Sequence, residues 1–177
     1  MHAFTPVADP LRLIERTVPD ADPTPKALAC YGTVFRQHEH PLSQHDEMWL
    51  RFVQDRPVSD ITIQYLEWVC ERVQQRGKTA LVLIWDNASW HTSKVVRAWI
   101  HDHNRRVKHD RKGVRLVVCF LPSKSPWLNP IEPKWVHAKR AIVEPTSLLS
   151  SEEICQRVSS HFHSPLLPPL AISTGVS

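Results

Sequence analysis

Two continuous apolar runs constrain the fold more than any other feature of this 177-residue chain. The first, Lys78–Trp85, has the length and composition of a strand buried on both faces of a sheet between helices. After a helix that begins at Thr92 or Ser93, a second buried strand is predicted at Val114–Leu121. A strand, helix and strand in this order favour parallel pairing with a right-handed crossover. The sequence therefore predicts an α/β fold.

The residues before this unit predict a hairpin and a helix. Lys26–Arg36 and Glu47–Val53 are typical of strands. Apolar residues then recur at four-residue steps over 61–76, which indicates a helix that ends before Gly77. We expect Asp60 to cap it through its side-chain oxygen.

Two further helices are predicted downstream, from Asn129-Pro130 to about residue 143 and after Ser150, whose capping box includes Glu153. We expect one domain at 26–163, between an irregular, proline-punctuated segment at 1–25 and a flexible Pro-rich tail at 164–177. Within the first segment, Leu11–Val18 could form a short edge strand.

Composition excludes several classes of protein. The four cysteines lie far apart without a C-x-x-C pair, which argues against a disulfide or zinc framework and favours buried thiols in a reducing cytoplasm. The histidines lack the spacing of common zinc motifs. No apolar run is long enough to cross a bilayer, so no membrane partner is expected.

The net charge of +4 is unevenly distributed. Residues 86–140 contain twelve Lys and Arg against four acids, so this segment carries about +8 and the remainder about −4. Such a field attracts polyanions, including nucleic acid. The alternative, a solvated basic surface without a ligand, is equally compatible with charge alone.

Asp86 and Glu132 are the candidate catalytic residues. Asp86 follows the first apolar run, at the carboxyl end of a predicted parallel strand, where open α/β folds bind ligands. Mg²⁺ is usually held by one or two carboxylates together with substrate phosphates, so the pair could form a metal site. Each acid also has a structural alternative: Asp86 could form a turn, and Glu132 could bond back to Asn129 from the third helical position.

The motifs around these acids resemble a known family. Residues 81–94 (LVLIWDNASWHTSK) and 121–135 (LPSKSPWLNPIEPKW) resemble the second and third acidic motifs of bacterial insertion-sequence transposases in the mariner-like group of the DDE superfamily. The resemblance implies a ribonuclease H-like fold, a mixed sheet flanked by helices. It also implies that three acids bind two Mg²⁺ or Mn²⁺ ions for in-line attack on DNA phosphodiesters.

In this resemblance Asp86 is the second acid and Glu132 the third. The interval between them is longer than is typical of the group, and we expect the extra length in a basic loop at Arg105–Arg115. The family's first Asp lies on the first, central strand, for which this chain has no counterpart. We therefore expect a truncated or frame-disrupted chain that lacks that strand, with Asp46 a weak substitute for the acid.

The expected partner is double-stranded DNA, together with a second copy of the chain or a complementing transposase fragment. DNA contacts are expected from polar and basic residues that flank the acids: Asn87, His91, Lys94, Arg105, Arg106, Lys108, Lys124, Lys134, Lys139 and Arg140. Trp127 could also stack on an extruded base. Two alternatives stay open: a non-catalytic DNA-binding or dimerising remnant of a transposase, and another ribonuclease H-like nuclease.

Overall fold

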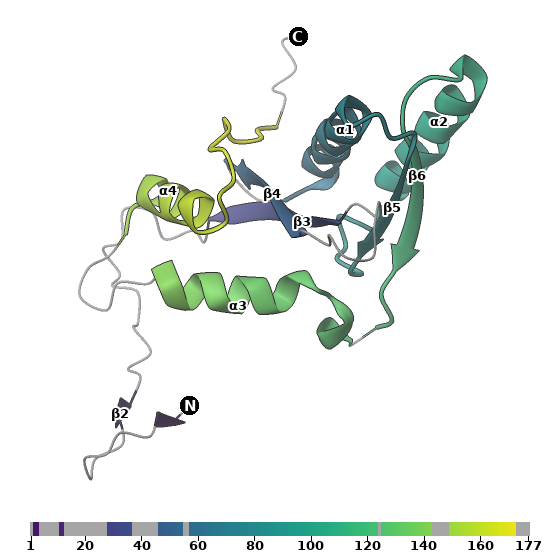
Figure 1. Ribbon diagram of the computed structural model, residues 1–177. Helices are drawn as coiled ribbons and strands as arrows, with labels where there is room; N and C mark the ends of the chain where they lie inside the picture. Colours follow the sequence, from purple (N-terminus) through teal and green to yellow (C-terminus); the bar gives the residue numbers. More distant parts are fainter. Residues whose placement is uncertain are drawn as a thin grey trace.

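The computed structural model describes residues 2–3, 11–12, 28–36, 46–54, 57–123, 125–142 and 149–172 (Figure 1). Near the amino terminus these include only a short antiparallel pair, β1 (His2–Ala3) with β2 (Leu11–Arg12). The rest of the expected irregular segment at 1–25 lies outside the described residues.

The predicted hairpin is confirmed. Strands β3 (Ala29–Arg36) and β4 (Asp46–Val53) pair antiparallel along their full length. At the end of the hairpin where the chain passes from β3 to β4, Arg36 Nε donates to Asp46 Oδ1 at 2.8 Å.

The parallel pairing is also confirmed. Strand β5 (Ala80–Trp85) pairs with β6 (Arg115–Phe120), and α2 (Lys94–Asp110) connects them. Ser93 is the N-cap of α2, and its side chain accepts a hydrogen bond from the Val96 amide at 3.2 Å. Helix α2 includes most of the predicted basic loop, so that expectation was wrong. The loop shortens to a turn in which Arg111 has a φ of 52° and Gly113 a φ of 106°.

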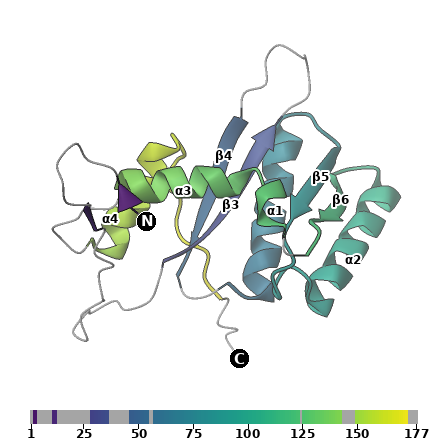
Figure 2. The same ribbon diagram turned by 90° about the horizontal axis from the view of Figure 1, so that it is seen from below.

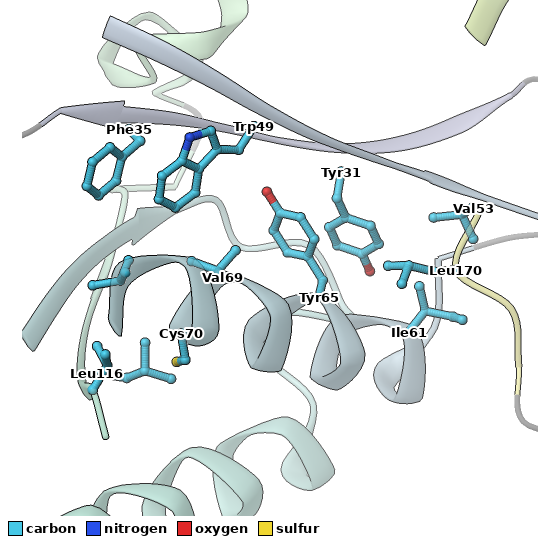
Figure 3. Packing of buried hydrophobic residues seen from close by; sticks show 12 residues of the cluster. Tyr31, Phe35, Trp49, Val53, Ile61, Tyr65, Val69, Cys70, Leu116 and Leu170 are labelled. Atoms are coloured by element: carbon cyan, nitrogen blue, oxygen red, sulfur yellow. The ribbon is translucent and has the colours of Figure 1, made fainter. Parts of the chain in front are cut away.

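Helix α1 (Ser59–Gln75) lies between the β3–β4 and β5–β6 pairs and contributes more buried residues to the core cluster between them than any other element (Figures 1 and 3). Its apolar stripe includes Ile61 and Val69, which are almost fully buried against β3 and β4. Tyr65 stacks on Tyr31 of β3 with ring centroids 4.8 Å apart. The expected cap at Asp60 was wrong: the N-cap is Val58, without a side-chain cap bond, and Asp60 lies in the first turn.

The opposite face of the hairpin is covered by α3 (Ile131–Ile142) and α4 (Ser151–His161), and Figure 2 shows α3 crossing over β3. The capping box of α4 is confirmed. The crossing of α3 requires Gly32, because a Cβ there would lie 2.5 Å from Trp135 Cζ2 and 2.9 Å from Ile131 Cδ1.

The chain after α4 differs from the flexible tail expected at 164–177. Leu170 is buried, and its amide donates to the Phe52 carbonyl at 2.7 Å. The Leu170 carbonyl in turn accepts from the Gln54 amide at 2.9 Å. Residues 173–177 lie outside the described residues.

The two-sided burial expected for β5 was wrong. Leu83 and Trp85 are buried, but Val82 and Ile84 on the other face are 60% and 56% exposed. The expected burial of all thiols also fails, because Cys119 on β6 is exposed. In the described parts of the chain, β3–β4 and β5–β6 form separate two-stranded sheets with no strand between them. None of the described helices is long and apolar enough to span a membrane.

Candidate functional site

One cavity of about 460 Å³ lies between β3 and β5, and both candidate acids line it. Asp86 follows directly after β5, and Glu132 lies in the first turn of α3. Two elements that are distant in sequence therefore bring the acids to the same cavity.

A network of hydrogen bonds fixes the Asp86 side chain. Its Oδ1 accepts from the Ala88 amide at 3.0 Å, which forms the turn expected from an Asp after a strand. The same oxygen lies 2.8 Å from His91 Nδ1. Because an ionised carboxylate only accepts hydrogen bonds, Nδ1 must carry the proton in this contact. The turn therefore orients the carboxylate, which is still 54% exposed, rather than burying it.

His91 is packed beside this carboxylate. Its ring stacks on Trp85, with centroids 4.5 Å apart and planes at 8°. Burial lowers the pKa of His91 below its ordinary value, although the hydrogen bond to Asp86 opposes that shift. The ring is consequently neutral near pH 7, with Nδ1–H bonded to Asp86 and Nε2 as the acceptor.

Glu132 has a simpler environment. Helix α3 begins at Ile131, so Glu132 is its second residue rather than the third. The Ile131 amide lies 3.5 Å from Asn129 Oδ1, and the expected bond from Glu132 back to Asn129 is absent within 125–142. The exposed carboxylate makes no hydrogen bond or ion pair with any described residue. The capping alternative therefore loses its support, and the carboxylate is available for a ligand.

The two acids suit a hard divalent cation in donor type and number. They do not form a complete protein site, because no group of three or more His, Cys, Asp and Glu side chains suited to a metal occurs in the described chain. Asp46 does not complete the set. It forms ion pairs with Arg36 at 2.8 Å and Lys134 at 3.3 Å, and it does not line the cavity.

The predicted DNA-binding residues fall into two groups. Four of the basic ones lie exposed on α2: Lys94, Arg105, Arg106 and Lys108. Lys134, Lys139 and Arg140 lie on α3, beyond Glu132. Lys124 lies outside the described residues. The charge asymmetry of the sequence thus corresponds to basic side chains on α2 and α3. Arg105, Arg106 and Lys108 lie near the carboxyl end of α2, which packs beside the start of β6, whereas Asp86 follows the far end of β5.

Some predicted contacts have structural partners. Asn87 Nδ2 donates to the Leu121 carbonyl at 2.7 Å, which ties the end of β5 to the end of β6. Lys134 forms an ion pair with Asp46, which joins α3 to β4. Their contacts with DNA stay predictions.

Sequence reasoning missed Arg36 and Trp90, which also line the cavity. Nothing in their sequence neighbourhood marks them, because a cavity between two strand edges depends on tertiary packing. Trp127, which the sequence suggested as a residue that could stack on a base, is 75% exposed in the short turn before α3.

Comparison with known proteins agrees with this geometry. The DDE superfamily endonuclease family matches residues 42–155, which include both acids, α1, α2 and β6. The chain belongs to this family. No curated protein and no solved structure matches the chain. The mixed α/β architecture, with its parallel β5–β6 pair, is consistent with the ribonuclease H-like fold of DDE endonucleases.

Proposed function

We propose that this chain is the catalytic part of a bacterial DNA transposase of the mariner-like group, incomplete when alone. The reaction is metal-dependent cleavage of DNA strands and transfer of their ends. The observation that supports it is the position of Asp86 and Glu132 on one cavity in a DDE superfamily endonuclease.

In this proposal Asp86 and Glu132 hold divalent metal. Bound Mg²⁺ or Mn²⁺ would supply charge stabilisation for the attacking and leaving oxygens of an in-line displacement at phosphorus. His91 positions the Asp86 carboxylate through the hydrogen bond from its Nδ1 to Asp86 Oδ1, at 2.8 Å. The second carboxylate oxygen, Oδ2, takes no part in this bond. The basic side chains of α3 lie beyond Glu132 and would attract the DNA backbone towards the acids, and those near the carboxyl end of α2 would extend the DNA-binding surface away from them.

The chain would act in the cytoplasm on double-stranded DNA at element ends and at the target. Its incompleteness is supported by the two-acid cavity, because the resemblance to DDE transposases implies three carboxylates. A second copy or a complementing transposase fragment would then be needed for activity.

Mn²⁺ titration of the purified chain, followed by calorimetry, tests the metal site directly. We expect a saturable site whose affinity falls about tenfold or more in Asp86→Asn and in Glu132→Gln, since each substitution removes a charged oxygen ligand. Asp102→Asn is the matched control. Asp102 is an exposed acid on α2 that pairs with Arg105 at 3.1 Å and does not line the cavity. The same Mn²⁺ affinity in the wild type and in all three variants would contradict the proposal.

Cleavage provides the second test. In any form complemented by the missing part, Asp86→Ala or Glu132→Ala should abolish Mn²⁺-dependent cleavage of element-end DNA. Undiminished cleavage in either variant would refute the assignment. A panel of branched and duplex substrates separates a transposase from another ribonuclease H-like nuclease.

A second candidate is a non-catalytic DNA-binding or dimerising remnant. It is favoured by the absence of a third metal-binding side chain among the residues that the structure describes. Such a remnant would bind DNA with salt-sensitive affinity and show no saturable Mn²⁺ site.

A further inference from the structure

A second cavity of about 380 Å³, the α2–β6 pocket, lies between the last turns of α2 and the start of β6. It is lined by His101, Asn104, Arg105, Val107, Lys108 and Arg115. Three of these side chains are Arg or Lys, and none is acidic. The pocket shares no lining residue with the cavity of the two candidate acids. It is therefore a separate basic site.

Two elements hold the walls of this pocket in place. Residues 101, 104, 105 and 108 recur at three- and four-residue steps, so they share one face of α2. On this face, the Asn104 side chain donates to the Leu116 carbonyl and accepts from the Leu116 amide, both at 2.8 Å. The neighbouring Arg115 is fixed by its own amide, which donates to the Thr79 carbonyl at 2.8 Å. The helix and the edge of β6 are thus clamped together at the pocket.

A glycine lets the intervening turn approach the helix. Gly113 has a φ of 106°, and a Cβ there would lie 3.1 Å from Val107 Cγ2. A side chain at this position would push the turn away from α2. The close approach brings Arg115, two residues later, next to the basic side chains of the helix.

Two of the three cations have no partner within the described chain. Lys108 and Arg115 are exposed and make no hydrogen bond or ion pair with any described residue. Arg105 differs, because it pairs with Asp102 at 3.1 Å. Cations that line one pocket repel each other, and an anion bound between them would replace this repulsion with attraction. The pocket is therefore suited to an anion.

The surroundings favour a polyanion over an isolated anion. Residues 101–115 contain six Lys and Arg against two acids, Asp102 and Asp110. The basic residues outside the pocket, Arg106, Arg111 and Lys112, are exposed towards the end of α2 and in the turn after it. A nucleic-acid backbone presents further phosphates to such neighbours, whereas a free phosphate ion does not.

We propose that the α2–β6 pocket binds one phosphate group of a nucleic-acid backbone, without metal, through Lys108 and Arg115. The guanidinium fork of Arg115 matches two phosphate oxygens, and Lys108 adds a point charge.

This contact lies far from the acids. Arg115 pairs with Ala80 at the start of the parallel sheet, whereas Asp86 follows its other end, so roughly 20 Å of strand separates the two positions. The choice of nucleic acid as the ligand rests on the proposed function, but the contact itself needs neither carboxylate. The pocket would hold nucleic acid at a distance from the reacting phosphate.

The test measures binding of a fluorescein-labelled DNA duplex to the full chain by anisotropy, in EDTA and at several salt concentrations. We expect Lys108→Ala and Arg115→Ala each to weaken binding about tenfold, because each removes a charged contact to phosphate. The slope of log K against log[salt] should fall by about 0.9, the value for one phosphate. The two variants are independent, so a folding defect in one leaves the other as the test.

Arg106→Ala is the matched control. It removes the same charge from the same helix, but Arg106 does not line the pocket, so binding should weaken by no more than about threefold. Equal losses in Arg106→Ala and in the two pocket variants would overturn the proposal in favour of diffuse surface charge. Unchanged binding in both pocket variants would also overturn it.

Inorganic phosphate distinguishes the two sources of the same chemistry. At constant ionic strength it should displace the duplex only at concentrations far above that of the duplex phosphates. Displacement at equal phosphate concentration would overturn the nucleic-acid assignment by making free phosphate the ligand. Because EDTA removes metal, these outcomes are independent of the Mn²⁺ titration, and either proposal can fail without the other.

Discussion

Asp86 combines two roles that the sequence presented as alternatives. Its Oδ1 closes the turn after β5 and also accepts from His91, and its side chain borders the cavity. The structural role orients the carboxylate and so supports the functional one. His91 is the residue on which this orientation depends, because its ring is held against Trp85.

The buried His91 should make stability depend on pH. Its pKa is lowered in the folded chain, so the unfolded chain binds more protons as the pH falls below the ordinary histidine range. The stability contributed by neutral His91 is fully present above about pH 6.5 and is lost as the pH falls from there through the folded pKa.

This prediction is checked by urea unfolding at several pH values from 7.5 to 5 in the wild type and in His91→Gln. We expect the decline in unfolding free energy on acidification to be smaller in His91→Gln. Identical declines in wild type and His91→Gln would show that the ring titrates as freely in the folded chain as in the unfolded one.

At the scale of elements, α2 protects the outer edge of the β5–β6 sheet. Asn104 Nδ2 donates to the Leu116 carbonyl and Asn104 Oδ1 accepts from the Leu116 amide, both at 2.8 Å. One side chain thus satisfies both backbone groups of a residue on an edge strand, where unpaired groups invite association with other chains.

Asn104→Ala should destabilise the protein by about 1–3 kcal/mol, because the Leu116 amide and carbonyl lose their partners in a partly buried place. Thermal and urea unfolding measure this loss, and light scattering measures any association through the freed edge. Asn104→Asp keeps an acceptor for the amide but sets a carboxylate against the carbonyl, so it should not restore stability. If Asn104→Ala is as stable as the wild type, water replaces the two hydrogen bonds between Asn104 and Leu116 without a loss of unfolding free energy.

The basic side of α2 should dominate the salt dependence of DNA binding. Arg105, Arg106 and Lys108 are exposed near its carboxyl end. Their combined substitution by Ala should reduce the slope of log K against log[salt] by about 0.9 for each phosphate that these side chains no longer neutralise. Arg105→Lys with Arg106→Lys keeps the charges and should keep the slope. A slope unchanged in the triple variant would place the DNA elsewhere on the chain.

The elements show where sequence reasoning succeeds and where it fails. The apolar runs predicted β5, β6 and their parallel pairing, because composition marks such strands. The predicted burial of both faces of β5 was wrong, because no described element covers Val82 and Ile84, which stay exposed. The basic run at 105–110 was interpreted as a loop because it lacks an apolar stripe. It is nevertheless helical, as the continuation of α2, whose earlier turns bury Val96 and pack Trp99 and Ile100 against the core, whereas Arg105, Arg106 and Lys108 face solvent.

The candidate site was predictable to a similar extent. Its acids follow directly from the motifs, and the prediction that both reach one site agrees with the shared cavity. The contribution of Arg36 could not be predicted, because it arises from the position of the β3 edge opposite β5. Contacts between unpaired edges carry no local signature in a sequence.

Within the described residues, the β3–β4 and β5–β6 strand pairs are joined mainly through α1. The core contacts of this helix extend from Trp49 of β4 to Leu116 of β6, and no backbone ladder connects the two sheets in the described parts of the chain. Side-chain packing, with side-chain hydrogen bonds such as Tyr31–Thr62 and Thr33–Tyr65, therefore holds the two strand pairs together. In a continuous sheet, the ladder bonds of β3 and β5 would add to this packing.

The isolated chain should accordingly be only marginally stable. We expect a thermal midpoint at or below the lower end of the ~45–65 °C range of mesophilic domains, and an unfolding enthalpy below about 0.7 kcal/mol per residue, because two strand edges stay unpaired. Calorimetry measures both quantities. A single cooperative transition well above that range, without any partner, would show that α1 packing suffices and that the open edges cost the fold little.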